Sequence, residues 1–197
     1  PLRFGFGLGE RFKLMLDLPL TFTSTEGAWS GMGSGALSLR LMPLSCWALT
    51  PTARVGGVGS LDVGALAVMY SGSLTSHVRI PVGPITLGIG NMGGIAKTVD
   101  GIDVSGFAID YDLTNWVTLN GGYIEGNLAA DLLGTGLGWR VFASDVRFFG
   151  DELFAEDYQQ IGATVAAGLP IGWIYTEVSY LTGHGYQGGS ARLGLRF

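Results

Sequence analysis

Apolar and polar residues alternate strictly over the end of the sequence, GGSARLGLRF. Successive side chains of a strand point to opposite faces, so this run has one apolar face and one charged face. The apolar face carries Leu193, Leu195 and Phe197, and the opposite face carries Arg192 and Arg196. A soluble strand buries such an apolar face, whereas a membrane barrel turns it towards lipid. The pattern therefore predicts a strand and leaves its surroundings open.

The same period of two recurs along the chain, broken by Gly, Asp, Asn and Pro. From Asp100 onward these breaks predict strands near 102–111, 115–125, 137–149, 158–169, 172–182 and 187–197. In the first half, FKLMLDLPLTF and GALSLRLM alternate clearly, whereas the strand boundaries between Thr50 and Met92 are blurred. Bacterial single-chain barrels have an even number of strands, so we expect twelve strands, with ten as the alternative.

Composition indicates an apolar solvent around these strands. Charged residues make up 14% of the chain, against about 25% in ordinary soluble domains, and the mean hydropathy is positive. No window holds the roughly 18 to 20 consecutive apolar residues that a spanning helix needs. Since only helices and closed barrels satisfy every backbone group in hydrocarbon, the sequence predicts an all-β fold. We expect one transmembrane antiparallel up-and-down β-barrel over residues 1–197.

Charge and cysteine content exclude several other classes of protein. The net charge of −5 and the lack of any Lys/Arg cluster argue against nucleic acid as a partner. The single Cys46 cannot form an intrachain disulfide and has no second metal ligand nearby in sequence. GIGNMG fits the glycine pattern of dinucleotide sites, but no helix is expected after it, so we expect no cofactor.

The terminal strand ARLGLRF, with its aromatic last residue, resembles the C-terminal signal of Gram-negative outer-membrane β-barrels. In detail, LGLRF is similar to the ends of autotransporter translocator domains and their solitary relatives. The resemblance implies a place in the outer membrane, in contact with its lipid and with lipopolysaccharide. It also implies that Leu193, Leu195 and Phe197 form the assembly signal that the barrel-assembly machinery recognises.

Charged residues on the polar face of the expected strands are candidates for the barrel lumen. A Lys or Arg that faces lipid at mid-bilayer costs about 2 to 4 kcal/mol, so such charges should point inside. There they could select ions or pair with one another. The candidates are Arg40, Asp110, Arg140, Glu177, Arg192 and Arg196.

Two connections carry residues that could do chemistry. An outer-membrane hydrolase needs a nucleophile, a histidine base and an orienting acid, and His184 has Ser179, Glu177 and Ser190 nearby in sequence. The segment GDELFAED holds four carboxylates of the type that Ca²⁺ prefers. Their spacing is not that of an EF-hand, so they are weak candidates and no metal site is expected; they are Asp151, Glu152, Glu156 and Asp157.

The lengths of the connections test the expected orientation. With the end of the last strand in the periplasm, GHGYQG and GDELFAED become extracellular and LPIG becomes a short periplasmic turn, as expected for such barrels. Two further connections break this rule. GNLAADLLGTG would be a long periplasmic connection, and DLTN a short extracellular one.

These observations favour a non-enzymatic outer-membrane barrel of a Gram-negative bacterium. It would act as a narrow channel or as a membrane-embedded structural or binding component. One alternative is a lipid-modifying hydrolase with its site at the barrel rim around His184. Another is an autotransporter-like translocator or the partner barrel of an envelope protein complex. A soluble calyx, with its apolar face turned inward around an apolar ligand, is a further alternative.

Overall fold

The computed structural model describes residues 2–25, 28–60, 65–99, 113–132, 135–151, 153, 156–169, 172–184 and 186–196. Regular structure in these ranges is entirely β, and among the described residues there is no helix long and apolar enough to cross a membrane. The strands are β1 (Leu2–Gly7), β2 (Phe12–Leu18), β3 (Leu20–Thr25), β4 (Ala28–Leu44), β5 (Trp47–Ser60), β6 (Ala65–Val82), β7 (Ile85–Val99), β8 (Thr114–Leu132), β9 (Thr135–Gly150), β10 (Asp157–Leu169), β11 (Gly172–Gly183) and β12 (Tyr186–Arg196).

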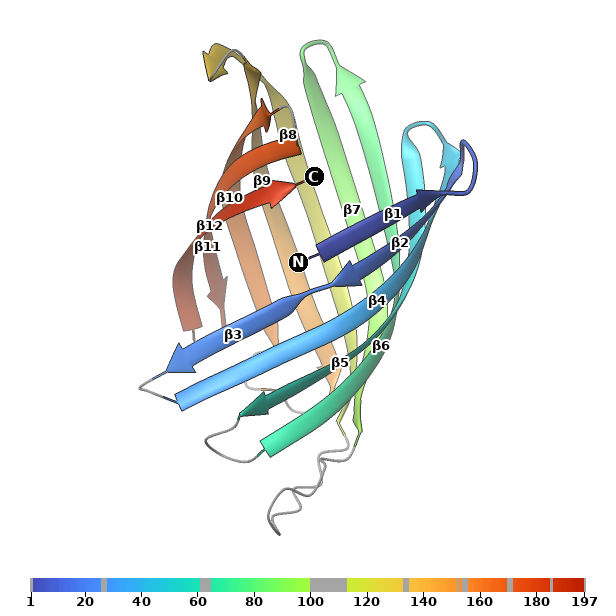
Figure 1. The fold of residues 1–197 in the computed structure, drawn as a ribbon, viewed down its shortest axis with the longest axis vertical. Coiled ribbons are helices and arrows are strands. Elements are labelled where there is room, and N and C mark those ends of the chain that lie inside the picture. Colours follow the sequence, from blue (N-terminus) through green and yellow to red (C-terminus); the bar gives the residue numbers. More distant parts are fainter. Residues whose placement is uncertain are drawn as a thin grey trace. The chain divides into compact units, whose positions relative to one another are not determined.

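The strands follow one another in the sheet in chain order, as expected for an up-and-down fold (Figure 1). The hydrogen-bonded order is β1-β2-β4-β5-β6-β7-β8-β9-β10-β11-β12, and β3 also pairs with β4. β2 and β3 therefore act as one interrupted strand, because Pro19 between them has no N–H to donate. The Pro19 carbonyl still accepts the Ser34 N–H at 3.1 Å. The described residues thus hold twelve strand segments in a sheet eleven strands wide.

This arrangement confirms the expected all-β, antiparallel up-and-down fold class with about twelve strands. The strand expected over 102–111 lies outside the described residues. The long connection expected at GNLAADLLGTG is wrong, because β8 continues to Leu132 and β9 begins at Thr135. The alternation persists through this segment: Ile124 and Leu128 are both 43% exposed on the same face. Its small and polar residues extend a strand and do not end it.

Every second connection between the described strands is short. β4 and β5 are joined across 45–46, β6 and β7 across 83–84, and β8 and β9 across 133–134. The intervening connections include 100–113 between β7 and β8 and 151–156 between β9 and β10. Outer-membrane barrels place short turns on the periplasmic side and longer loops outside. Apart from 184–185 between β11 and β12, the strand boundaries of the structure therefore keep the short-turn rule, which the boundaries expected from sequence broke.

Contacts divide the chain into two units. In the unit that contains β1 to β5, the β2–β4 register sets Leu16 opposite Leu37 and Lys13 opposite Arg40. Leu37 is 53% exposed. On the other face, the buried Ser38 hydroxyl hydrogen-bonds that of Thr52 at 2.8 Å. Each strand thus has one exposed apolar face and one crowded polar face.

The second unit contains β9 to β12, which lie side by side (Figure 1). The apolar face here carries Ile161, Val165 and Val178, with exposed fractions of 58%, 46% and 54%. On the opposite, polar face lie Thr164 and Ser179, the latter 9% exposed. Large apolar side chains are more exposed than their polar neighbours, the reverse of a soluble domain. This inversion suits strands whose apolar face contacts lipid.

Candidate functional site

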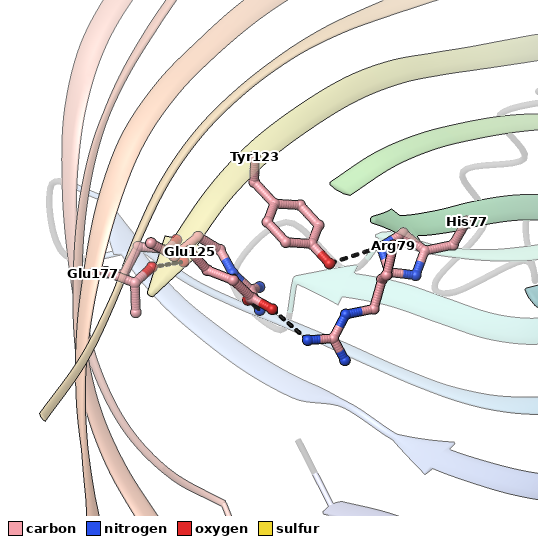
Figure 2. Close-up of polar contacts among 7 residues, drawn as sticks. His77, Arg79, Tyr123, Glu125 and Glu177 are labelled. Atoms are coloured by element: carbon pink, nitrogen blue, oxygen red, sulfur yellow. Dashed lines mark hydrogen bonds and ion pairs between the residues drawn. The ribbon is translucent and has the colours of Figure 1, made fainter. Parts of the chain in front are cut away.

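Among the described residues, the largest group of interacting polar side chains lies on the polar face of the second unit (Figure 2). Glu125 on β8 accepts hydrogen bonds from Arg140 on β9, at 2.6 Å from Nη2 and 3.0 Å from Nε. It also forms an ion pair with Arg79 on β6. We call His77, Arg79, Tyr123, Glu125 and Arg140 the polar cluster. One carboxylate therefore neutralises part of the charge of two guanidinium groups.

Tyr123 joins the two sides of the polar cluster. Its hydroxyl lies 3.0 Å from Nε2 of His77, and the two rings are stacked with centroids 5.7 Å apart. The guanidinium carbon of Arg140 lies 4.5 Å from the centre of the Tyr123 ring, a cation–π contact. The period of two explains this convergence, since Tyr123 and Glu125 share one face of β8 and His77 and Arg79 one face of β6.

A second, looser ion pair lies on the polar face at β11 and β12. Glu177 is 3.8 Å from Nη1 of Arg192, whose side chain is 67% exposed. The Thr164 hydroxyl donates to Glu177 at 3.4 Å. Glu177 and Arg192 are directly opposite one another in the β11–β12 register. This is a surface-like pair, held much less tightly than Glu125.

The charged residues expected in the lumen differ in their contacts, and not all of them are described by the structure. Arg140, Glu177 and Arg192 make the ion pairs above, and Arg40 lies in the other unit on the polar face. Asp110 and the side chain of Arg196 lie outside the described residues. That these charges line a lumen stays a prediction. Arg79 and Glu125 were not among the candidates chosen from sequence. Glu125 is two residues from Tyr123 and therefore lies on the same face of its strand.

The polar cluster is built to hold strands together rather than to react. Both oxygens of Glu125 are engaged by arginines, so this carboxylate is not free to take a proton from a substrate. The His77 ring is engaged by Tyr123. A general base needs to reach the substrate's proton directly or through one water. We therefore assign the polar cluster a structural role.

A shallow groove of about 370 Å³ lies on the apolar face of the same unit. Its walls combine apolar and polar side chains: Asn120, Ala143, Ser144, Asp145, Gln159, Gln160, Ile161, Tyr180 and Thr182. Asp145 accepts hydrogen bonds from Gln159 and from Arg147, both at 2.9 Å. On this face of β10, the exposed Ile161 is next to the polar Gln159. On this face of β9, Ala143 is next to the charged Asp145. The groove therefore lies where the apolar face turns polar.

His184 lies next to the polar end of this groove. It sits in the turn between β11 and β12, where its backbone N–H donates to Oδ1 of Asp157 at 3.2 Å. Asp157 is the first residue of β10, the strand that carries Gln159. It lies beside the end of β11, the strand that carries Thr182. Asp157 thus anchors the turn and leaves the His184 side chain exposed.

The residues grouped with His184 by sequence are not assembled around it. The Ser179 hydroxyl hydrogen-bonds that of Ser190 at 2.8 Å and accepts from Gln160 at 2.9 Å. Ser179 is buried on the polar face, and Glu177 is paired with Arg192. Within the described ranges, no serine hydroxyl therefore contacts His184. Among the described residues, water is therefore a better candidate than a serine hydroxyl for the nucleophile of a hydrolysis at His184.

The described carboxylates of the acidic connection between β9 and β10 do not lie together. Asp151 accepts the Thr114 N–H at 2.6 Å, and Asp157 is engaged by the backbone at His184. Glu156 is exposed, and Glu152 lies outside the described residues. Over the described part of the chain, no three His, Cys, Asp or Glu side chains are placed to hold a metal ion.

Comparison with known proteins places the fold. No protein-family model matches the chain, and no curated protein sequence is similar to it. LpxR from Salmonella typhimurium has a similar structure, with a TM-score of 0.59 over 98% of this chain and 86% of that chain, at 11% sequence identity. The fold is that of an outer-membrane β-barrel. At this identity the similarity establishes the fold and not the residues of a site.

The same comparison corrects the expectation of a non-enzymatic barrel. LpxR is an outer-membrane lipid A deacylase, so a protein of similar structure is an enzyme. Sequence alone did not indicate this, because no diagnostic spacing of catalytic residues occurs in the chain. Neither a porin-like nor an autotransporter-like character is supported by the comparison.

Proposed function

We propose that this protein is an outer-membrane hydrolase that removes an acyl chain from a glycolipid of the outer leaflet, such as lipopolysaccharide. The observation that carries the proposal is the fold similarity to LpxR over 98% of the chain. A Gram-negative outer membrane is the corresponding location. The hydrolase was the alternative to the channel expected from sequence, and the comparison favours it.

The groove on the apolar face offers a place for such a lipid. An acyl glycolipid has a polar, hydrogen-bonding head and apolar chains. Asp145, Gln159 and Thr182 line the polar part of the groove, and Ile161 and Ala143 its apolar part. A lipid lying against the barrel wall would then present its ester bonds at the boundary between the two, close to the turn that carries His184.

His184 is our candidate for the general base. Its exposed imidazole would take a proton from water as the water oxygen attacks the ester carbonyl carbon. The tetrahedral intermediate would then expel the sugar alkoxide, which receives the proton back from His184. The products are a free fatty acid and a glycolipid with one acyl chain fewer.

Mass spectrometry of lipid A after incubation with the detergent-folded protein tests the proposal. We expect loss of one acyl chain, and a rate reduced at least about 100-fold in His184→Ala, the usual minimum for a lost general base. His77→Ala is the matched control, because His77 lies in the polar cluster. If wild-type protein leaves lipopolysaccharide intact, the hydrolase is excluded. If His184→Ala stays fully active, the hydrolase stands and the base lies elsewhere.

The resemblance of the last strand to autotransporter ends supports a separate proposal about assembly. Leu193 is 76% exposed on the apolar face of β12 and so is available for recognition by the barrel-assembly machinery. Leu195 belongs to the same strand, while Phe197 lies outside the described residues. Their role as an assembly signal, and any envelope protein partner, stay predictions.

A narrow channel also stays a prediction, and steady conductance steps in a planar bilayer would support it.

A further inference from the structure

A cavity of about 300 Å³ lies on the β1–β2–β4 side of the sheet, beside the turn that joins β1 to β2. Its lining residues are Gly7, Gly9, Glu10, Phe12, Lys13, Arg40 and Met42. All of them belong to one unit of the structure. The cavity shares no lining residue with the groove and does not include His184, so a ligand bound there is independent of the proposed hydrolase.

Two cationic residues line this cavity from neighbouring strands. Lys13 on β2 and Arg40 on β4 are direct partners in the antiparallel register. Like charges in such opposite positions destabilise a sheet, unless something between them compensates. The Lys13 side chain lies across Gly5, with Nζ 3.1 Å from where a Cβ atom at that position would be. The ammonium group is thereby held against β1, on the side of Lys13 away from β4.

Arg40 carries a donor that lacks a partner among the described residues. This donor is Nε, which is buried and has no hydrogen-bond acceptor in the described part of the chain. Buried polar groups are nearly always paired with protein, water or an ion, so this donor is satisfied by a water molecule or by an anion. Glu10 is the one carboxylate in the described cavity lining, and it is exposed on the turn. Within the described ranges, no ion pair links a carboxylate to Lys13 or Arg40.

The backbone leaves room for a small molecule next to these cations. No described atom outside the neighbouring residues lies within 4 Å of where a Cβ atom at Gly7 or Gly9 would be. Gly9 also has a φ of +132°, which a side chain would strain. The turn between β1 and β2 therefore leaves the space beside Lys13 open. In a chain of net charge −5, this is a local positive concavity.

We propose that this cavity binds a small oxyanion, a phosphate or a carboxylate, between Lys13 and Arg40. The planar guanidinium presents Nε and a terminal nitrogen as a fork that matches two oxygens of such an anion. The Lys13 ammonium supplies a second donor when its side chain turns from Gly5 towards β4. The bound anion separates the two cations and satisfies the buried Nε. Glu10, which lies at the exposed rim, repels an anion, so binding is expected against Lys13 and Arg40 and away from the rim.

Isothermal titration of the detergent-folded protein with inorganic phosphate tests the site. Ionic strength is held constant with chloride, and acetate is titrated in parallel as the carboxylate probe. We expect saturable binding of at least one of the two anions. Affinity should fall at least tenfold in Arg40→Gln and in Lys13→Gln. Arg54→Gln is the matched control, because Arg54 hydrogen-bonds Ser34 on the same sheet and does not line the cavity.

Two results would overturn the proposal. One is the absence of saturable binding of either anion by the folded wild-type protein. The other is unchanged affinity in Arg40→Gln and Lys13→Gln. If Arg40→Gln does not fold, as judged by circular dichroism, Arg40→Lys replaces it. Arg40→Lys keeps the charge and loses Nε, so the site predicts weaker binding for this variant as well.

Discussion

The ring of Tyr123 fills the space that a Cβ atom on Gly88 would need. Gly88 is buried on β7, and Tyr123 reaches across it from β8 towards His77 on β6. One glycine of the pattern GIGNMG is thereby explained: Gly88 has no side chain, which leaves room for the ring of Tyr123. Gly162 on β10 does the same for Phe142, whose ring would lie within 3 Å of a Cβ atom there.

We expect Gly88→Ala to destabilise the protein by about 1 to 3 kcal/mol, the usual cost of overpacking. The added methyl group overlaps the Tyr123 ring, which must leave His77 and Arg140. Thermal unfolding of the detergent-folded protein, followed by circular dichroism, measures the loss. Gly93→Ala on the same strand is the control, since no described atom lies within 4 Å of the new Cβ position. Equal stability of the two variants would contradict the packing of Tyr123 over Gly88.

Glu125→Gln should destabilise the fold by about 1 to 3 kcal/mol, because two arginines lose their charged acceptor. The Glu125 side chain is only 17% exposed, so water replaces it poorly. Urea unfolding in lipid vesicles measures the change. Glu156→Gln is the control, because Glu156 is exposed and pairs with no cation in the part of the chain that the structure describes. A Glu125→Gln variant as stable as this control would show that the polar cluster holds no strands together.

Arg192→Gln should change stability by less than about 1 kcal/mol, in contrast to Glu125→Gln. The Arg192 side chain is 67% exposed and lies 3.8 Å from Glu177, and such exposed pairs contribute little. The same urea titration provides the measurement, at low and at high salt. A large loss that salt does not reduce would mean that Glu177 and Arg192 are shielded from water to a greater degree than their exposure indicates.

The faces of the strands were predictable because alternation is a local property. Ile161 and Val165 are exposed opposite Gln160 and Thr164, as the pattern of β10 predicts. The end of β8 was mispredicted for the same reason. Small and polar residues look like a turn when read locally, whereas hydrogen bonds to the neighbouring strands decide where β8 ends.

The polar cluster and the enzymatic relative could not be predicted from the sequence. Arg79 and Glu125 are 46 residues apart, and their contact depends on how β6, β7 and β8 are aligned in the sheet. The sequence pattern indicates the face of each residue but not its height along the strand. His184 was a candidate from its residue type, its expected extracellular connection and its neighbours in sequence. Its distance from Ser179 likewise depends on where the two residues lie in the strands.

Arginine substitutions along one strand test whether the apolar face contacts lipid. Val178 and Thr182 both lie on the apolar face of β11, Val178 within the strand and Thr182 near its end. We expect Val178→Arg to cost about 2 to 4 kcal/mol of folding free energy in a bilayer and Thr182→Arg about 0 to 1 kcal/mol, because the cost of a charge falls with distance from the bilayer centre. Reversible folding into lipid vesicles in denaturant measures both. A soluble calyx predicts another pattern. There the apolar face encloses a ligand, folding needs no lipid, and Val178→Arg is equally harmful with and without vesicles.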